Sequence, residues 1–209
     1  MIKEGLFVVF EGPSGTGKST QYELLRPYCP GAYFTREPGG TMYGEELRTL
    51  VQYRRDLEID PMASALTYMA SRANLVGLEI RPRLERGQTV ICDRYWPSTY
   101  AYQGSEGVKD NDILNLAQIA TGGLEPDYYL YINLPIEEII RRKTGCKDID
   151  RYDERLMNDM RYLNEVVSRY DLLRNNHSWI NIDGRGSIEE VHLRVLAVAR
   201  DIGLVDLEN

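Results

Sequence analysis

The chain has 209 residues, of which 43% are hydrophobic, and it carries a formal net charge of −7 with a pI near 5. This length can bury one core, so a single domain over residues 1–209 is the simplest interpretation. An acidic chain lacks the clustered positive charge that releases counterions from a nucleic acid, and we expect no nucleic-acid partner. A small anionic substrate must then be held by arginines gathered locally.

Membrane and secretion signals are missing from the sequence. No stretch approaches the roughly 20 apolar residues that cross a bilayer, and the N-terminus lacks the apolar segment of a signal peptide. We therefore expect no membrane partner and a cytoplasmic location. Cys29, Cys92 and Cys146 are widely spaced and have no metal-binding motif around them, so we interpret them as reduced thiols.

Short apolar runs alternate with longer helical patterns along the chain. The runs typical of strands are LFVVF, AYF, TVIC, YYLYI and WINI, at 6–10, 32–34, 89–92, 128–132 and 179–182. Helical patterns cover 18–26, 42–55, 61–86, 97–103, 110–121, 135–143, 153–175 and 187–202. This alternation predicts βαβ units and an α/β fold, with a parallel five-stranded sheet flanked by helices.

The first apolar run is followed at once by EGPSGTGKST, in which Gly12, Gly17, Lys18 and Ser19 have the spacing of a phosphate-binding loop. Small residues let backbone N–H groups turn around an anion, and the helix that follows adds its positive end. Lys18 can reach the outer phosphates, and the Ser19 hydroxyl is placed to bind Mg²⁺. The residues that we predict to bind the phosphates are Gly12, Ser14, Gly15, Thr16, Gly17, Lys18, Ser19 and Thr20.

The third apolar run ends in Asp93 and Arg94. In a phosphate-loop protein, an acid at the end of a strand commonly orients water on the magnesium ion, so Ser19 and Asp93 are our candidates for the metal site. Arg94 can bind a phosphate through two hydrogen bonds, which suits a phosphoryl acceptor. A helix cap for Asp93 and a salt bridge for Arg94 are the structural alternatives.

Tyr68 and Arg72 lie four residues apart, and therefore on one face of the helical pattern 61–86. An aromatic ring with a guanidinium one turn away can hold a nucleobase by stacking and hydrogen bonding. Taken alone, the two residues are better explained as a tyrosine that packs on the core and an arginine that lies in solvent. They become informative only beside the other motifs.

Several motifs occur together and in order: FVVFEGPSGTGKST, FTREPGGT followed by GEELR, YMASRANL, DRYWPSTYAYQG and YYLYINLP. In this combination, across about residues 6–185, the chain resembles the thymidylate kinase family. The resemblance implies a phosphate-loop nucleoside monophosphate kinase fold with a short lid. It also implies transfer of the γ-phosphoryl group of ATP to dTMP, giving dTDP for dTTP synthesis, with Mg²⁺ as cofactor, in a homodimer.

The resemblance also implies an acceptor pocket. Tyr68 stands where the family stacks an aromatic ring on thymine, Arg72 where an arginine hydrogen-bonds the base, and Tyr102 where an aromatic ring crowds the sugar 2′ position. The residues that match the stretch reading the base edge and lining the pocket are Ser98, Thr99 and Gln103, and those that match the surroundings of the acceptor phosphate and the metal are Glu37, Arg48 and Arg94.

Ser14 departs from the family pattern, which usually has an acidic residue here that reaches toward the sugar 3′-hydroxyl. A serine keeps a hydrogen bond but loses a charge-assisted one, which is about twice as strong. Sugar selectivity, and to a lesser degree the identity of the acceptor, therefore stays open. Two alternatives follow: a kinase of the same fold for another deoxynucleoside monophosphate or a nucleoside, or an NTP-hydrolysing switch.

Both alternatives meet an objection in the sequence. Arg48 and Arg94 favour an acceptor that already carries a phosphate, because a neutral nucleoside would leave these charges unpaired. Guanine-specific switches usually carry an Asn-Lys-x-Asp motif, and the chain has none.

The phosphate loop has no arginine between Gly12 and Lys18, so the charge of the transition state must be met from elsewhere. The resemblance points to a lid at about 143–153, in which arginines replace a loop arginine. The basic residues of this region are Arg141, Arg142, Lys143, Lys147 and Arg151, of which Arg151 is the best positional match. By the same analogy, the adenine site lies near the lid and the DGRG turn at 183–186.

Arg151→Ala tests the proposed lid arginine. An arginine delivered to the transferring phosphoryl group contributes about 10³ to 10⁵ in rate, so we expect this variant to lower kcat far more than it raises the KM for dTMP in steady-state assays. Lys18→Ala is the reference variant and is expected to abolish transfer. Weaker binding with an unchanged kcat for Arg151→Ala would remove Arg151 from the catalytic role.

Overall fold

The computed structural model describes residues 5–144, 149–174 and 178–205. Its sheet has the strand order β2-β3-β1-β4-β5, and every neighbouring pair is parallel. The strands are β1 (Phe7–Glu11), β2 (Tyr33–Arg36), β3 (Val90–Asp93), β4 (Tyr128–Asn133) and β5 (Trp179–Asp183). The predicted α/β fold with a parallel five-stranded sheet is confirmed, and each strand begins within one residue of its predicted start.

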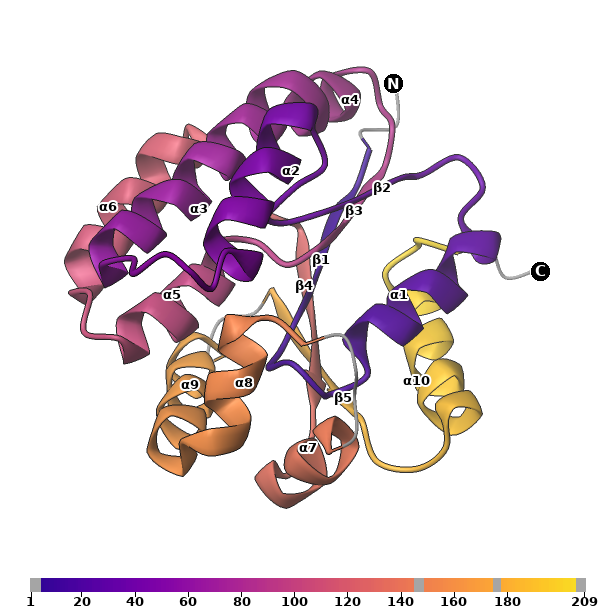
Figure 1. Cartoon of the computed structure of the whole chain (residues 1–209). Helices are drawn as coiled ribbons and strands as arrows, with labels where there is room; N and C mark the ends of the chain where they lie inside the picture. Colours follow the sequence, from indigo (N-terminus) through magenta and orange to yellow (C-terminus); the bar gives the residue numbers. More distant parts are fainter. Residues whose placement is uncertain (1–4, 145–148, 175–177, 206–209) are drawn as a thin grey trace.

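Helices cover both faces of this sheet (Figure 1). On one face lie α1 (Lys18–Leu25) and α10 (Ile188–Asp201), and on the other lie α3 (Pro61–Leu75) and α5 (Trp96–Ser105). The remaining helices are α2 (Met42–Arg48), α4 (Arg81–Glu85), α6 (Asp110–Thr121), α7 (Ile136–Lys143), α8 (Arg151–Asn158) and α9 (Met160–Leu173), with a short 3₁₀ turn at Arg26–Tyr28 and wider turns at Thr49–Tyr53 and Val76–Ile80.

The central strand β1 supplies both halves of the core. Because side chains alternate along a strand, Val8 and Phe10 pack toward α1 and α10, while Phe7 and Val9 pack on the opposite face against Leu75 at the end of α3. All four of these side chains are buried, and an apolar strand interior on both faces is expected for a parallel sheet with two helical layers.

The helical pattern predicted over 61–86 forms a continuous helical stretch, but it is not uniform. A π-helical turn at Val76–Ile80 separates α3 from α4. Pro82 has no backbone N–H, and its ring would clash with the carbonyl of the preceding turn in a regular α-helix. The widened turn, in which Arg81 N–H bonds to the Val76 carbonyl, precedes this proline and accommodates it.

The prediction of one helix over 153–175 is wrong, because two helices meet at Asp159. The backbone of Asp159 is extended, and its Oδ1 accepts hydrogen bonds from the N–H groups of Arg161 and Tyr162, at 3.0 and 3.1 Å. Asp150 caps α8 in the same way, at 2.9 Å from Tyr152 N and 2.8 Å from Asp153 N. The acid at each boundary replaces backbone partners that a continuous helix would supply.

No helix within residues 5–144, 149–174 and 178–205 is long and apolar enough to cross a membrane. Cys29 and Cys92 are buried free thiols, and Cys146 lies outside the described residues.

Asp159→Ala tests the cap that divides α8 from α9. Loss of this carboxylate is expected to lower the free energy of unfolding by about 1 kcal/mol, measured by urea denaturation. Asp159→Asn keeps a capping oxygen and should stay close to the unchanged protein. An equal loss in both variants would show that the charge of Asp159, rather than its cap, stabilises the fold.

Candidate active site

The loop between β1 and α1 has a backbone that only small residues adopt easily. Gly15 and Gly17 have φ values of 92° and 91°, in the left-handed region. A Cβ atom at Gly15 would lie 2.9 Å from Cγ of Lys143, so the space is closed as well. Thr16 is buried and donates through its hydroxyl to the Pro13 carbonyl at 3.0 Å, which braces the loop from inside.

Lys18, Ser19 and Asp93 meet at the start of α1. Lys18 Nζ lies 2.9 Å from Asp93 Oδ1, and the Ser19 hydroxyl donates to Asp93 Oδ2 at 3.1 Å. Burial and the charge of Arg94 lower the pKa of Lys18. Burial acts to raise the pKa of Asp93, but the charges of Lys18 and Arg94 hold it below its ordinary value. The two residues that we predict to hold a metal, Ser19 and Asp93, therefore lie within hydrogen-bonding distance of each other.

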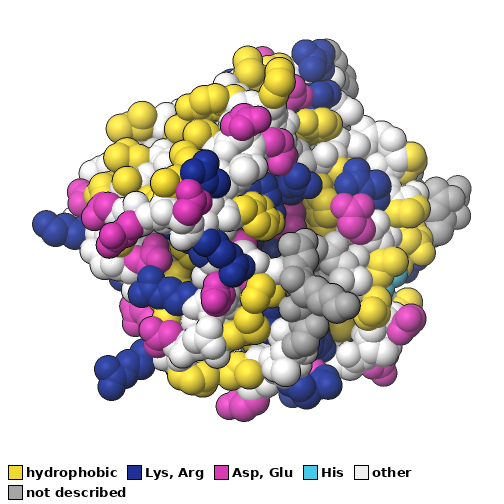
Figure 2. Space-filling view, viewed as in Figure 1, with side chains coloured by type: hydrophobic (Ala, Val, Ile, Leu, Met, Phe, Trp, Pro, Cys, Tyr) yellow, Lys and Arg dark blue, Asp and Glu magenta, His cyan; other side chains and the backbone are white. Residues whose placement is uncertain are grey.

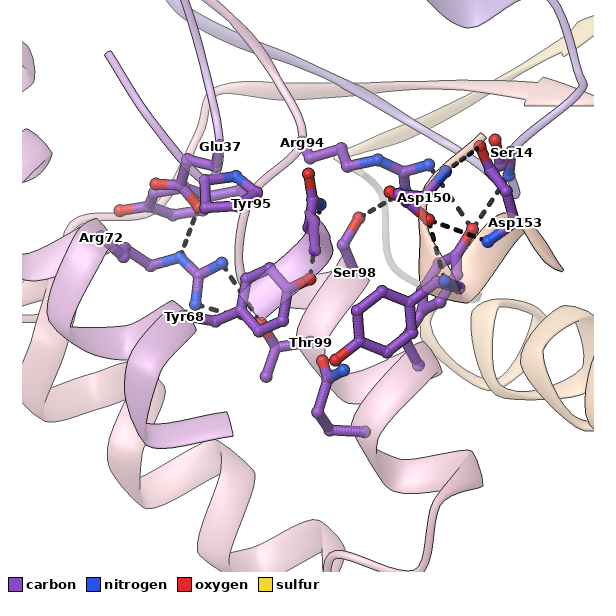
Figure 3. A pocket seen from close by; sticks show the side chains of 15 residues that line it. Ser14, Glu37, Tyr68, Arg72, Arg94, Tyr95, Ser98, Thr99, Asp150 and Asp153 are labelled. Carbon is purple, nitrogen blue, oxygen red and sulfur yellow. Dashed lines mark hydrogen bonds and ion pairs between the residues drawn. The ribbon is translucent and has the colours of Figure 1, made fainter. Parts of the chain in front are cut away.

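Two cavities adjoin at this point. The larger one, of about 980 Å³, is lined by the phosphate loop, by the end of α7 and by the turn before α10. The smaller one is lined from α3, α5 and α8 (Figure 3). Its lining contains most of the predicted acceptor residues together with Ser14: Ser14, Glu37, Tyr68, Arg72, Arg94, Ser98, Thr99, Tyr102 and Gln103.

Arg72 marks one end of the smaller cavity. It is buried, its Nε donates to Glu37 Oε2 at 2.6 Å, and its Nη2 donates to the Thr99 hydroxyl at 3.3 Å. The Tyr68 ring packs edge-on against Tyr152 of α8, with 6.0 Å between centroids. Aromatic faces beside fixed polar groups can hold a planar ligand and read its edge.

Arg94 marks the other end, where Ser14 also lies (Figure 3). Its guanidinium lies 5.3 Å from the Tyr102 ring centroid, and the Tyr102 hydroxyl accepts the Ser14 N–H at 2.9 Å. Arg94 is the one described non-glycine residue with a positive φ, at 78°. A cation in this position suits a phosphate group.

Two acids, the α8 cap Asp150 and Asp153 in the first turn of α8, line both cavities at their boundary. Lys143 Nζ lies 2.6 Å from Asp153 Oδ2. Burial and the neighbouring charge of Asp153 raise the pKa of Asp150. These acids could not be singled out from the sequence, because DIDRYDER fits a solvated helix start equally well.

The structure does not bring Arg151 to the phosphate loop. Its guanidinium donates to the carbonyl oxygens of Arg54 and Leu57, and it lines neither cavity. Arg48 lines the larger cavity instead of the smaller and donates to the Pro38 carbonyl at 3.1 Å. The proposed lid covers residues 145–148, including Lys147, which lie outside the described residues.

The basic residues at the end of α7, in contrast to Arg151, lie at the larger cavity. Arg141, Arg142 and Lys143 all line it. Arg142 donates to the Thr16 carbonyl at 3.3 Å and to the Gly184 carbonyl at 2.9 Å, and so connects the phosphate loop with the DGRG turn. This is the neighbourhood in which we expect the adenine of the donor.

The sequence analysis missed two buried residues behind Arg94. Glu11 and Tyr170 are both fully buried, and the Tyr170 hydroxyl donates to Glu11 Oε2 at 3.0 Å. Glu11 could have been noticed in the sequence, because it is a charged residue that directly follows the apolar run LFVVF. Tyr170 had no such signal, since its place in a helical pattern shows only that it faces inward.

The fold and the paired cavities define a phosphate-loop kinase of the nucleoside monophosphate kinase class. The sequence model of the family described as "Thymidylate kinase" matches residues 10–195. The chain therefore belongs to the thymidylate kinase family, and the resemblance seen in its motifs is confirmed.

Individual relatives agree with the family match. The chain is similar to a protein named thymidylate kinase from Roseiflexus castenholzii, with 38% identity over 92% of each chain. Another of the same name, from Caldanaerobacter subterraneus subsp. tengcongensis, is 37% identical over 94% of this chain and 96% of its own. A third, from Synechococcus sp. strain CC9605, is 39% identical over 84% of this chain and 87% of its own.

Glu37→Gln tests the buried carboxylate that faces Arg72. Burial raises the pKa of Glu37 to about 7, against the opposing charge of Arg72, so the folded protein takes up this proton at a higher pH than the unfolded chain does. The contribution of Glu37 to the free energy of unfolding is therefore full below the ordinary pKa of a glutamate, and it is lost as the pH rises through about 7.

We expect the unchanged protein to lose on the order of 2 kcal/mol more than Glu37→Gln between about pH 5 and pH 8, by urea unfolding. Gln keeps an oxygen for Arg72, so the variant should remain folded. Parallel pH dependences in the two proteins would contradict the raised pKa.

Proposed function

We propose that this chain transfers the γ-phosphoryl group of ATP to dTMP, giving dTDP, as a step in dTTP synthesis. The observation that carries the proposal is the shared boundary of the two cavities. Ser14, Glu37 and Arg94 line both, so a donor in the larger cavity and an acceptor in the smaller one would meet beside Arg94.

The donor side is supplied by the phosphate loop. The N–H groups of the loop and the positive end of α1 would hold the phosphates, with Lys18 at the outer ones. Lys18 already contacts Asp93, so its ammonium is held at the mouth of the loop. In phosphoryl transfer the protein mainly positions the reactants and stabilises charge, and these groups do both.

The donor set also fits Mg²⁺. Ser19 Oγ and the ionised carboxylate of Asp93 are oxygen ligands 3.1 Å apart, and magnesium prefers oxygen ligands that it shares with phosphates and water. When bound, the ion would neutralise charge on the outer phosphates of the donor. Ser19 and Asp93 are the residues that we propose to hold it, directly or through water.

The acceptor nucleotide would lie in the smaller cavity, between Arg72 at one end and Arg94 at the other. Arg72, Thr99 and Gln103 would read the thymine edge beside the Tyr68 ring, and Arg94 would bind the 5′-phosphate. Thr99 and Gln103 are buried and line this cavity, and hydrogen bonds to a ligand discriminate strongly where water is excluded. Tyr102 lies between these ends, where the sugar has to pass, and would crowd its 2′ position.

Family membership supports further proposals for the whole protein. These are a single domain, a lid near 143–153 that includes Arg151, a cytoplasmic location, and a homodimer. Leu66 and Leu78 on the long α3–α4 stretch are 47% and 64% exposed. Such apolar side chains are suited to the contact between two copies.

An acceptor panel tests the reaction. We expect ADP release from ATP and Mg²⁺ to show the highest kcat/KM with dTMP among dTMP, dUMP, dCMP, dGMP, dAMP, their ribonucleotide counterparts and thymidine. ATP turnover without any acceptor is the control, and unstimulated hydrolysis would favour a switch. A different best acceptor would leave the phosphoryl-transfer machinery in place and overturn our assignment of the base or sugar contacts, with Ser14 as the first residue to examine.

A further inference from the structure

We propose that Glu11 is a positioning residue for Arg94 and acts on it through the hydroxyls of Ser98 and Tyr170. The four residues come from β1, from the end of β3, from α5 and from α9, and we call them the Arg94 support. This inference rests on the proposed function in one respect, since it takes Arg94 to bind the acceptor phosphate.

Glu11 is the centre of the support. It is fully buried, and its Oε2 accepts hydrogen bonds from the Ser98 hydroxyl at 2.8 Å and the Tyr170 hydroxyl at 3.0 Å. Its Oε1 accepts the backbone N–H of Tyr95 at 2.8 Å. A buried carboxylate needs such donors, and here they come from three separate segments of the chain.

The carboxylate fixes the direction of the hydroxyl hydrogens. Burial raises the pKa of Glu11, whereas the charge of Arg94 and the hydrogen bonds from Ser98 and Tyr95 act to lower it. In its ionised form the carboxylate can only accept, and each hydroxyl has a single hydrogen to donate. The Ser98 and Tyr170 oxygens are also 2.9 Å apart. Because both hydrogens are donated to Glu11 Oε2, neither remains for this contact, and lone pairs of both hydroxyl oxygens are left to accept from Arg94.

Arg94 uses those lone pairs. Its Nη1 donates to Ser98 Oγ at 2.8 Å, to the Tyr170 hydroxyl oxygen at 3.1 Å and to the Gly12 carbonyl at 3.1 Å. Its Nη2, by contrast, has one contact within the described residues, with the Tyr102 hydroxyl at 3.5 Å. The support therefore occupies one terminal nitrogen of the guanidinium and leaves the other for a phosphate.

The hydroxyls also keep the two charges from pairing directly. Glu37 Oε2 pairs directly with Arg72 Nε at 2.6 Å, whereas none of the ion pairs within the described residues joins Glu11 to Arg94. A carboxylate bound directly to Arg94 would compete with the phosphate for the same donors. Placed behind two hydroxyls, Glu11 can orient Arg94 without taking its place at the substrate.

Tyr170→Phe is the sharpest test, because it removes one hydroxyl and keeps the ring. We expect the Kd for dTMP, measured by titration calorimetry, to rise about tenfold, while the Kd for thymidine stays within about twofold, since thymidine has no phosphate for Arg94 to bind. The KM for ATP should change little.

Tyr129→Phe is the matched control. Tyr129 is also buried, and its hydroxyl also donates to a carboxylate at 3.0 Å, that of Glu125, away from both cavities. This variant should leave both Kd values unchanged. An equal loss of dTMP and thymidine binding in Tyr170→Phe would overturn the proposal and show that Tyr170 only stabilises the fold.

A double-mutant cycle tests whether the support acts through Arg94. In an Arg94→Gln background, Tyr170→Phe should add little further loss of dTMP binding, because the group it orients is gone. Additive losses would overturn the proposal. A failure of the proposed function looks different, because the unchanged protein would then bind or phosphorylate another acceptor better than dTMP.

Discussion

The site depends on the pairing of β1 with β3. Phe10 lies opposite Asp93 in this parallel pair, and the N–H of Arg94 donates to the Phe10 carbonyl at 2.9 Å. Two segments far apart in sequence, the phosphate loop and the Asp93–Arg94 pair, therefore leave the sheet side by side. The contact of Lys18 with Asp93 and that of Arg94 with Gly12 both follow from this register, as does the line along which the two cavities meet.

Charged side chains are distributed unevenly over the molecule. The chain is acidic as a whole, yet Lys and Arg side chains lie around the middle of the face drawn in Figure 2, with carboxylates between them. In the interior, Lys18 contacts Asp93 and Lys143 contacts Asp153, because an unpaired buried charge is costly. These pairs hold the cations near the place where a polyanionic substrate would replace the carboxylates as a partner.

The sequence predicted the strands, the phosphate loop and most of the residues that the smaller cavity brings together, since these depend on local patterns or on motifs whose residues keep fixed places. It did not predict features that depend on contacts between distant segments. The break at Asp159 needs a side chain to cap a new helix inside a continuous pattern. The distance of Arg151 from the phosphate loop depends on the carbonyls of Arg54 and Leu57, and the role of Glu11 on hydroxyls from two other helices. No spacing rule connects such residues.

Arg94 has a positive φ, and it is held by two hydroxyls that donate to a buried carboxylate. Such a backbone costs on the order of 1 kcal/mol, and an apolar residue in place of a buried charge often makes a protein more stable. These features thus cost stability at the place where we propose that the chain recognises a phosphate. Selection for heat resistance alone would favour glycine at position 94 and an apolar residue at position 11. The result would be a more stable protein that no longer binds its substrate.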